Sequence, residues 1–220
     1  MGLGFGARID CSGGISNTPA EKPCGAPQSF TILESMLEYI AWTELVLCWI
    51  AWVLAFLKPS RESAGRKTTE RAPSSRLGIA FVFIAFFLVW VYARPVGYHQ
   101  PKAESIASMI LGPFFVALAW AAAHRLGKQW RYEAALSEDH ELIQTGVYGW
   151  LRHPIYTSML GMYVTTGLAW SWWPKFLAGL VFFIIGTEIR IASEEKLLGG
   201  RFPGYAEYRR RTKGYIPFIR

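Results

Sequence analysis

The sequence predicts an all-α integral membrane protein with about five transmembrane helices, and three observations lead to this fold class. Hydrophobic residues make up 52% of the 220 positions, and ten residues are Trp, which is more apolar than an average soluble domain. The mean hydropathy is positive. Three segments, 77–93, 105–123 and 155–173, contain 17, 19 and 19 residues without a charge. A membrane-spanning helix needs about 20 such residues.

Two further segments complete the predicted bundle. Residues 39–57 are apolar apart from Glu44, and residues 176–189 meet a charge only at Glu188. The last two spans are joined by the short stretch Trp-Ser-Trp-Trp-Pro at 170–174, which predicts a helical hairpin with Trp side chains in the headgroup layer. Residues 197–211 then alternate apolar and basic positions, which predicts a C-terminal interfacial helix.

The chain therefore divides into three predicted regions. Residues 1–29 are rich in Gly, Pro and small polar side chains and lack the apolar core of a signal peptide, so we expect a flexible segment. Residues 30–137 hold the first three spans with their connectors. Residues 138–220 hold the last two spans and the amphipathic segment.

The distribution of basic residues predicts the orientation in the membrane. With five spans, eighteen of the 23 Lys and Arg residues fall on one face, in 58–76, 125–152 and 190–220. Basic loops are retained in the cytoplasm. We therefore expect a multi-pass protein whose C-terminus is cytoplasmic and whose N-terminus is extracytoplasmic.

Several classes of function are disfavoured. The net charge of +7 is explained by anionic lipid headgroups, and no nucleic-acid recognition motif accompanies it, so we expect membrane lipids and no nucleic acid as partners. Cys11, Cys24 and Cys48 form no CxxC pair or zinc spacing, so no metal site is predicted, although a Cys11–Cys24 disulfide is possible. Phosphate-binding loops, Gly-x-Ser-x-Gly elbows and dinucleotide turns are absent from the sequence.

Two charged clusters remain as candidates for chemistry, namely 152–154 and 190–195. The hairpin returns both to the cytoplasmic face of the membrane, where ionisable groups usually have a function. Arg190 and Glu194 are four residues apart and share one helix face; an ordinary salt bridge at a helix end is the alternative. His153 precedes Pro154, an arrangement that presents an imidazole and backbone N–H groups to a ligand. A simple helix cap is the alternative there.

At these residues the sequence resembles the isoprenylcysteine carboxyl methyltransferase family, and beyond it the wider group that includes phospholipid N-methyltransferases. The resemblance covers about residues 138–219 and rests on His-Glu-Leu at 140–142, Thr-Gly-Val-Tyr at 145–148, Trp150, Arg-His-Pro at 152–154, Tyr156, Arg-Ile at 190–191, Glu-Glu at 194–195, Tyr-Ala-Glu-Tyr at 205–208 and Ile-Pro-Phe-Ile at 216–219. Ser158 and Pro203-Gly204 depart from the family pattern.

The resemblance implies S-adenosyl-L-methionine as methyl donor, bound by the region 138–220. It also implies the site residues. Arg190 and Glu194 are the catalytic candidates, with Arg190 orienting the acceptor. The cofactor-binding candidates are His140, Leu142, Gly146, Tyr148, Arg152, His153, Tyr156 and Glu195, of which Arg152 supports the loop.

The predicted function is methylation of the carboxylate of a prenylated cysteine or a related lipidic acid. The first alternative is a phospholipid or amine N-methyltransferase with the same donor. A nicotinamide-dependent sterol reductase is a further alternative, because enzymes of that class share an Arg-His-Pro-like element. Their chains, however, have roughly twice as many spans as this one. A non-catalytic membrane scaffold is the last alternative. The sequence predicts neither the identity of the acceptor nor the oligomeric state.

Overall fold

The computed structural model describes residues 28–64, 67–91 and 100–216, with side chains from Ser35 onward. Three sequence predictions therefore lie wholly or almost wholly outside the described residues: the flexible segment 1–29, the Cys11–Cys24 disulfide and the motif end at 217–219. The chain divides into two units, Met1–Met36 and Leu37–Arg220. The first unit contributes only the opening turns of the first helix to the described residues, and the following paragraphs concern the second unit.

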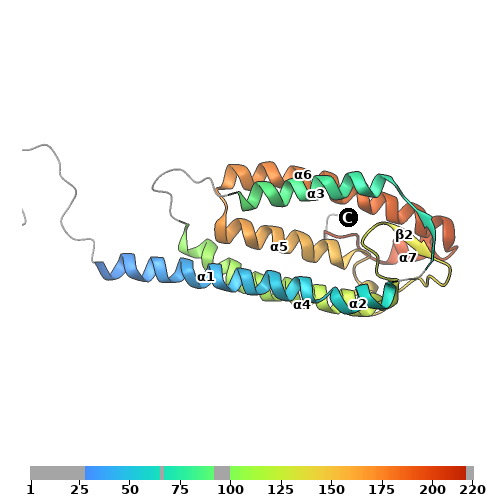
Figure 1. Cartoon of the computed structure of the whole chain (residues 1–220), viewed down its shortest axis with the longest axis horizontal. Coiled ribbons are helices and arrows are strands. Elements are labelled where there is room, and N and C mark those ends of the chain that lie inside the picture. The colour runs from blue at the N-terminus through green and yellow to red at the C-terminus, as the bar shows by residue number, and fades with distance from the viewer. Residues whose placement is uncertain (1–27, 65–66, 92–99, 217–220) are drawn as a thin grey trace, which may run out of the picture. The chain divides into compact units, whose positions relative to one another are not determined.

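Long helices dominate the described part of the chain (Figure 1). The long helices are α1 (Gln28–Leu54), α3 (Ser74–Trp90), α4 (Lys102–Leu126), α5 (Pro154–Trp170) and α6 (Trp173–Arg201). Shorter elements are α2 (Leu57–Ser63), α7 (Tyr205–Arg211) and the 3₁₀ turns η1 (Gly127–Gln129) and η2 (Gly146–Gly149). Each predicted span therefore corresponds to a helix, with ends shifted by several residues.

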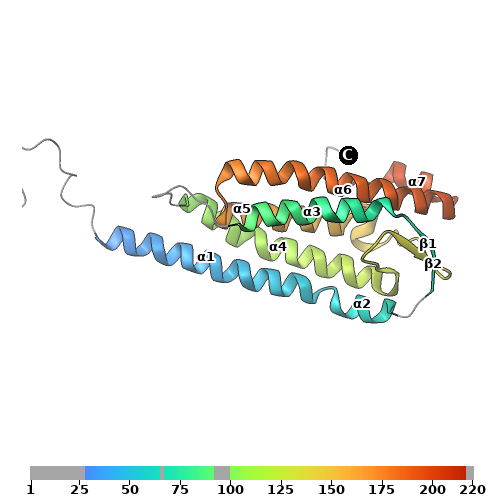
Figure 2. The same cartoon turned by 45° about the horizontal axis from the view of Figure 1, so that its top comes forward.

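The helices pack in two main pairs, α3 with α6 and α4 with α5 (Figure 2). Gly78 on α3 and Gly186 on α6 allow the first pair to approach closely, since a Cβ on either glycine would lie 2.6 Å from the other's carbonyl oxygen. A core of Val82, Val89, Tyr163 and Phe183 joins α5 to this pair. This packing fixes α6, which carries one of the two charged clusters.

Three helical stretches are long and apolar enough to cross a membrane, namely Ser35–Ser63, Lys102–Gln129 and Trp173–Arg201, and α3 is a shorter apolar helix. A membrane protein is therefore supported. The count of five spans, the hairpin and the side of the membrane on which each terminus lies stay predictions. Although α5 and α6 follow each other directly, each packs mainly against another helix.

The prediction of an all-α fold is wrong in one detail. Residues 58–76, expected to be a solvated connector, contain α2 and the strand β1 (Thr68–Arg71). This strand pairs antiparallel with β2 (Ala135–Ser137), which lies in the long connector before α5. The small sheet ties two connectors together at the end of the bundle where the charged clusters lie (Figure 1).

The C-terminal region also differs from the prediction of one interfacial helix over 197–211. Helix α6 continues to Arg201, so the cluster 190–195 lies inside a helix rather than at its end. The chain then turns at 202–204, and α7 begins at Tyr205. The apolar side chains Tyr205 and Tyr208 are buried against the protein rather than exposed to headgroups.

Candidate functional site

A cavity of about 590 Å³ lies at the end of the bundle that holds both charged clusters. Its apolar end is formed by α1 and α3, through side chains such as Trp49, Phe83 and Phe86. Its polar end is formed by the connector before α5, the first turn of α5, and α6, where Arg190 and Glu194 line it. The cavity can therefore hold a molecule that is polar at one end and apolar at the other.

The polar end is built on the turn at 146–153. Gly146 has a φ of +65°, a conformation that glycine adopts without strain, and it starts η2. The carbonyl of Tyr148 accepts a hydrogen bond from the Tyr208 hydroxyl at 2.7 Å. The backbone N–H of Arg152 donates to the carbonyl of Lys213 at 2.8 Å. The segment after α6 thus holds this turn in place.

Arg152 and Glu195 form a buried ion pair behind the turn. Their side chains are 7% and 9% exposed, and Arg152 Nε lies 3.1 Å from Glu195 Oε1. The same guanidinium donates to the carbonyls of Arg209, at 3.0 Å, and Thr212. Arg209 approaches the other carboxylate oxygen at 3.6 Å. These contacts connect the turn, α6 and α7 into one unit.

His153 lies between Glu194 and Glu195 of α6. Its Nε2 is 3.2 Å from Glu195 Oε1 and its Nδ1 is 3.6 Å from Glu194 Oε2. Burial favours the neutral imidazole, but the hydrogen bonds and negative charges of both glutamates outweigh burial and raise the pKa of His153 above its usual value. The two carboxylates therefore favour the protonated imidazole between them. Pro154 follows at the first turn of α5, where its missing N–H leaves no donor unpaired.

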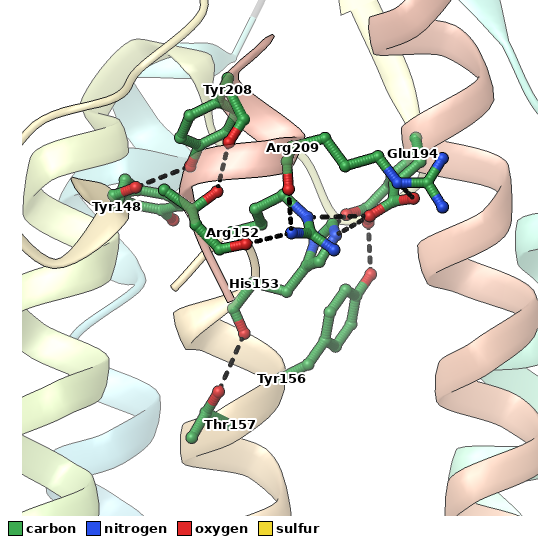
Figure 3. A network of polar contacts seen from close by, with 10 residues as sticks. Tyr148, Arg152, His153, Tyr156, Thr157, Glu194, Tyr208 and Arg209 are labelled. Carbon is green, nitrogen blue, oxygen red and sulfur yellow. Dashed lines mark hydrogen bonds and ion pairs between the residues drawn. The ribbon is translucent and has the colours of Figure 1, made fainter. Parts of the chain in front are cut away.

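Tyr156 connects the two catalytic candidates, and Figure 3 shows its hydroxyl directed at Glu194. Arg190 Nε–H donates to the Tyr156 hydroxyl at 2.8 Å, and that hydroxyl donates to Glu194 Oε1. The guanidinium lies 5.4 Å from the centre of the Tyr156 ring and donates through Nη2 to the carbonyl of Tyr132 at 2.7 Å. The sequence left an ordinary salt bridge between Arg190 and Glu194 as the alternative. In the structure the Tyr156 hydroxyl lies between the two side chains and hydrogen-bonds to both.

The Arg-His-Pro turn and the Arg-x-x-x-Glu-Glu helix, the two charged clusters that the sequence singled out, thus meet in the structure. Residues 108–199 match the model of the isoprenylcysteine carboxyl methyltransferase family. The resemblance is thus confirmed over the central part of the chain.

One curated relative is similar over a longer stretch. The cobalt-zinc-cadmium resistance protein CzcN of Cupriavidus metallidurans is 28% identical over 150 residues, which cover 64% of this chain and 63% of that protein. The chain thus spans just under two thirds of the length of this relative. Among residues 35–64, 67–91 and 100–216, no group of three or more His, Cys, Asp or Glu side chains is placed to hold a metal ion.

The structure brings most of the family-implied residues to the cavity. Its polar end is lined by His140, Tyr148, Arg152, His153, Tyr156, Arg190 and Glu194. Three implied cofactor residues do not line it. Gly146 begins the turn and Leu142 lies shortly before it in the chain. Glu195 lies behind the turn, in the ion pair with Arg152. The departure at Ser158 has a partner of its own, because Ser158 Oγ accepts a hydrogen bond from Trp52 Nε1 at 3.2 Å.

Sequence reasoning missed several residues that line the cavity, including Gln129, Tyr132 and Tyr205. Gln129 and Tyr132 lie in the connector after α4, which folds over the cavity because β2 pairs with β1. A four-residue and a three-residue strand are too short to leave a periodic signal in the sequence. Tyr205 was interpreted as part of an interfacial helix edge, since its spacing from Tyr208 matches one.

Proposed function

We propose that this protein is a membrane methyltransferase that uses S-adenosylmethionine to esterify the carboxylate of a prenylated cysteine or a related lipidic acid. The observation that carries the proposal is the cavity, which joins an arginine-containing polar end to an aromatic apolar end. The family match at residues 108–199 supports the reaction class.

The polar end fits the donor in charge. The whole cavity, at about 590 Å³, lies within the range of small-molecule sites. The donor carries a sulfonium and an ammonium group, and the Glu194 carboxylate lines the cavity with His140, Tyr148 and His153 around it. Gln129 Oε1 is a buried acceptor on the same wall, and it makes no hydrogen bond within the described residues. When bound, the donor would supply an electrophilic methyl group.

Arg190 is suited to orient the acceptor carboxylate. Its Nε and Nη2 groups are used by Tyr156 and Tyr132, which fixes the plane of the guanidinium. Its Nη1 group has no hydrogen-bond partner in the part of the chain that the structure describes, and Arg190 lines the cavity. The N–H groups along the edge of a guanidinium are spaced to donate hydrogen bonds to a carboxylate. A carboxylate with a pKa near 3.5 is already ionised at neutral pH and needs no general base.

The same network limits how strongly Arg190 neutralises the nucleophile. A full ion pair with the guanidinium would lower the reactivity of the acceptor carboxylate. Because Tyr156 connects Arg190 to Glu194, part of the cationic charge is already balanced by this protein's own carboxylate. The chain's contribution is then alignment, which can supply about 7–11 kcal/mol, and exclusion of water from opposite charges that cancel during transfer.

The apolar end supports a lipidic acceptor. Val53 on α1 and Phe83 on α3 both line the cavity and are 51% and 63% exposed, so the cavity reaches the surface between these two helices. In a bilayer this surface faces acyl chains. An apolar tail can enter there while its carboxylate reaches Arg190.

The amine alternative makes a different demand on Glu194. A protonated amine must lose a proton before it attacks, so Glu194 would act as a base. Its two oxygens are already engaged by the Tyr156 hydroxyl and by His153, which favours a carboxylate acceptor. The rate should be independent of pH above about 6 for a carboxylate acceptor, because its pKa is near 3.5. The rate should rise with pH for an amine.

The proposal is tested with purified protein in detergent and methyl-labelled donor. Prenylcysteines, fatty acids and phosphatidylethanolamine are supplied as separate acceptors, with Arg190→Ala as the control variant. We expect label in the carboxylate-bearing lipids with the wild type and nearly none with the variant. Label found only in phosphatidylethanolamine would contradict the proposal in favour of N-methylation, and label in none of them would favour a scaffold.

A further inference from the structure

Tyr205 places a buried hydroxyl group at the cavity. It is the first residue of α7, its side chain is 4% exposed, and it lines the polar end of the cavity. The hydroxyl oxygen is shielded from solvent, and no hydrogen-bond partner for it lies among the described residues. Buried hydroxyl groups in proteins are nearly always hydrogen-bonded. An exception at the wall of a cavity therefore indicates a ligand contact.

Tyr208, three residues later on the same helix, shows the ordinary arrangement. It is also buried and packs edge to face against Tyr205, with ring centres 6.0 Å apart. Its hydroxyl donates to the carbonyl of Tyr148 at 2.7 Å. The helix therefore positions two phenol groups side by side, one used to hold the turn and one without a partner in the described chain.

The polar groups of this part of the cavity suit a ligand that has both hydrogen-bond acceptors and hydrogen-bond donors. Burial raises the pKa of Tyr205, and the negative charge of Glu195 raises it further while Arg152 opposes this effect. The phenol thus stays protonated and able to donate at all physiological pH values. Gln129 lines the same cavity with an amide oxygen that makes no hydrogen bond to the described residues and can accept from an N–H group.

We propose that the Tyr205 hydroxyl is a further binding contact for the methyl donor and donates a hydrogen bond to an acceptor atom of its nucleoside or amino-acid part. This inference rests on the proposed function and adds a residue of α7 to the donor site.

Tyr205→Phe removes only the hydroxyl and gives a sharp test. Because the hydroxyl has no partner within the described protein, its loss should leave the Tm of the ligand-free protein unchanged or raise it. The Kd for S-adenosylmethionine and for S-adenosylhomocysteine, measured by isothermal titration in detergent, should rise about 2- to 12-fold, the range expected for one lost hydrogen bond.

Tyr163→Phe is the matched control. Tyr163 is fully buried in the helical core, away from the cavity lining, and its hydroxyl donates to the carbonyl of Phe176 at 2.7 Å. Its loss should lower Tm and leave donor binding unchanged. The inference is overturned if Tyr205→Phe binds both ligands as tightly as the wild type, or if its Tm falls as far as that of Tyr163→Phe. Failure of the wild type to bind either ligand at millimolar concentration would instead overturn the proposed function itself.

Discussion

Replacing Tyr156 by Phe removes one oxygen from the centre of the catalytic network and tests whether that network matters. The Tyr156 hydroxyl accepts from Arg190 Nε at 2.8 Å and donates to Glu194. The side chain is 4% exposed, so bulk solvent does not reach the hydroxyl directly. The ring itself remains in the variant, and so does the packing of α5 against its neighbours.

The magnitude follows from the two hydrogen bonds. Each involves a charged partner and contributes about 1.5–3 kcal/mol. Arg190 and Glu194 are one helical turn apart, so they can pair directly once the hydroxyl is gone and recover part of this energy. We therefore expect a net loss of about 1.5–3 kcal/mol in transition-state stabilisation, which corresponds to a decrease in kcat/KM of about 10- to 150-fold.

The assay is steady-state transfer from labelled donor to a prenylcysteine, with the Kd for the donor measured in parallel. We expect the decrease mainly in kcat, because the change misaligns Arg190 rather than removing a wall of the cavity. Tyr163→Phe, the same deletion on the same helix but outside the cavity, should keep kcat near the wild-type value. A Tyr156→Phe variant that retains more than half of the wild-type kcat/KM would refute the role given to the hydroxyl.

Three further variants probe the surroundings of this network. Arg190→Lys should keep some activity and Arg190→Ala should lose nearly all, as measured by transfer rates; equal activity in both variants and the wild type would remove this residue from the mechanism. Gly78→Ala should lower Tm by an overpacking energy of about 1–3 kcal/mol and reduce activity, because its Cβ would lie 2.7 Å from Arg190 Cγ. Gly200→Ala, whose Cβ would meet nothing within 4 Å among the described residues, is the control, in which neither Tm nor activity should fall because Ala is favoured over Gly in a helix. Since the pKa of His153 is raised in the folded protein, its stabilising charge is fully present below about pH 6.5 and is lost as pH rises through the folded pKa. The Tm should therefore fall with rising pH in the wild type and fall less in His153→Gln; identical slopes would contradict the assignment.

The sequence predicted the helices well because a membrane imposes a simple length and composition rule. Five apolar stretches became five helices, and the join at 170–174 was short enough to indicate that the ends of the last two return together. Which helices pair was not predictable in this way. The close approach of α3 and α6 depends on Gly78 meeting Gly186, and those residues lie far apart in the sequence with no pattern to connect them.

The site was predictable where local motifs carry it. Arg152, His153, Tyr156 and Glu194 meet as the two charged clusters indicated. The different positions of Glu194 and Glu195 relative to the cavity were not predictable. Glu195 pairs with Arg152 behind the turn instead of lining the cavity, because successive residues on a helix point about 100° apart and only Glu194 faces inward.

The bond that the transferred methyl group makes tests the account most directly. Lipid product from the wild-type protein, methyl-labelled donor and a prenylcysteine is extracted and treated with alkali. The account predicts that the label is released as volatile methanol, because a carboxylate acceptor gives a base-labile ester. Label that stays in the lipid after alkali would identify an N-methyl group and contradict the central claim.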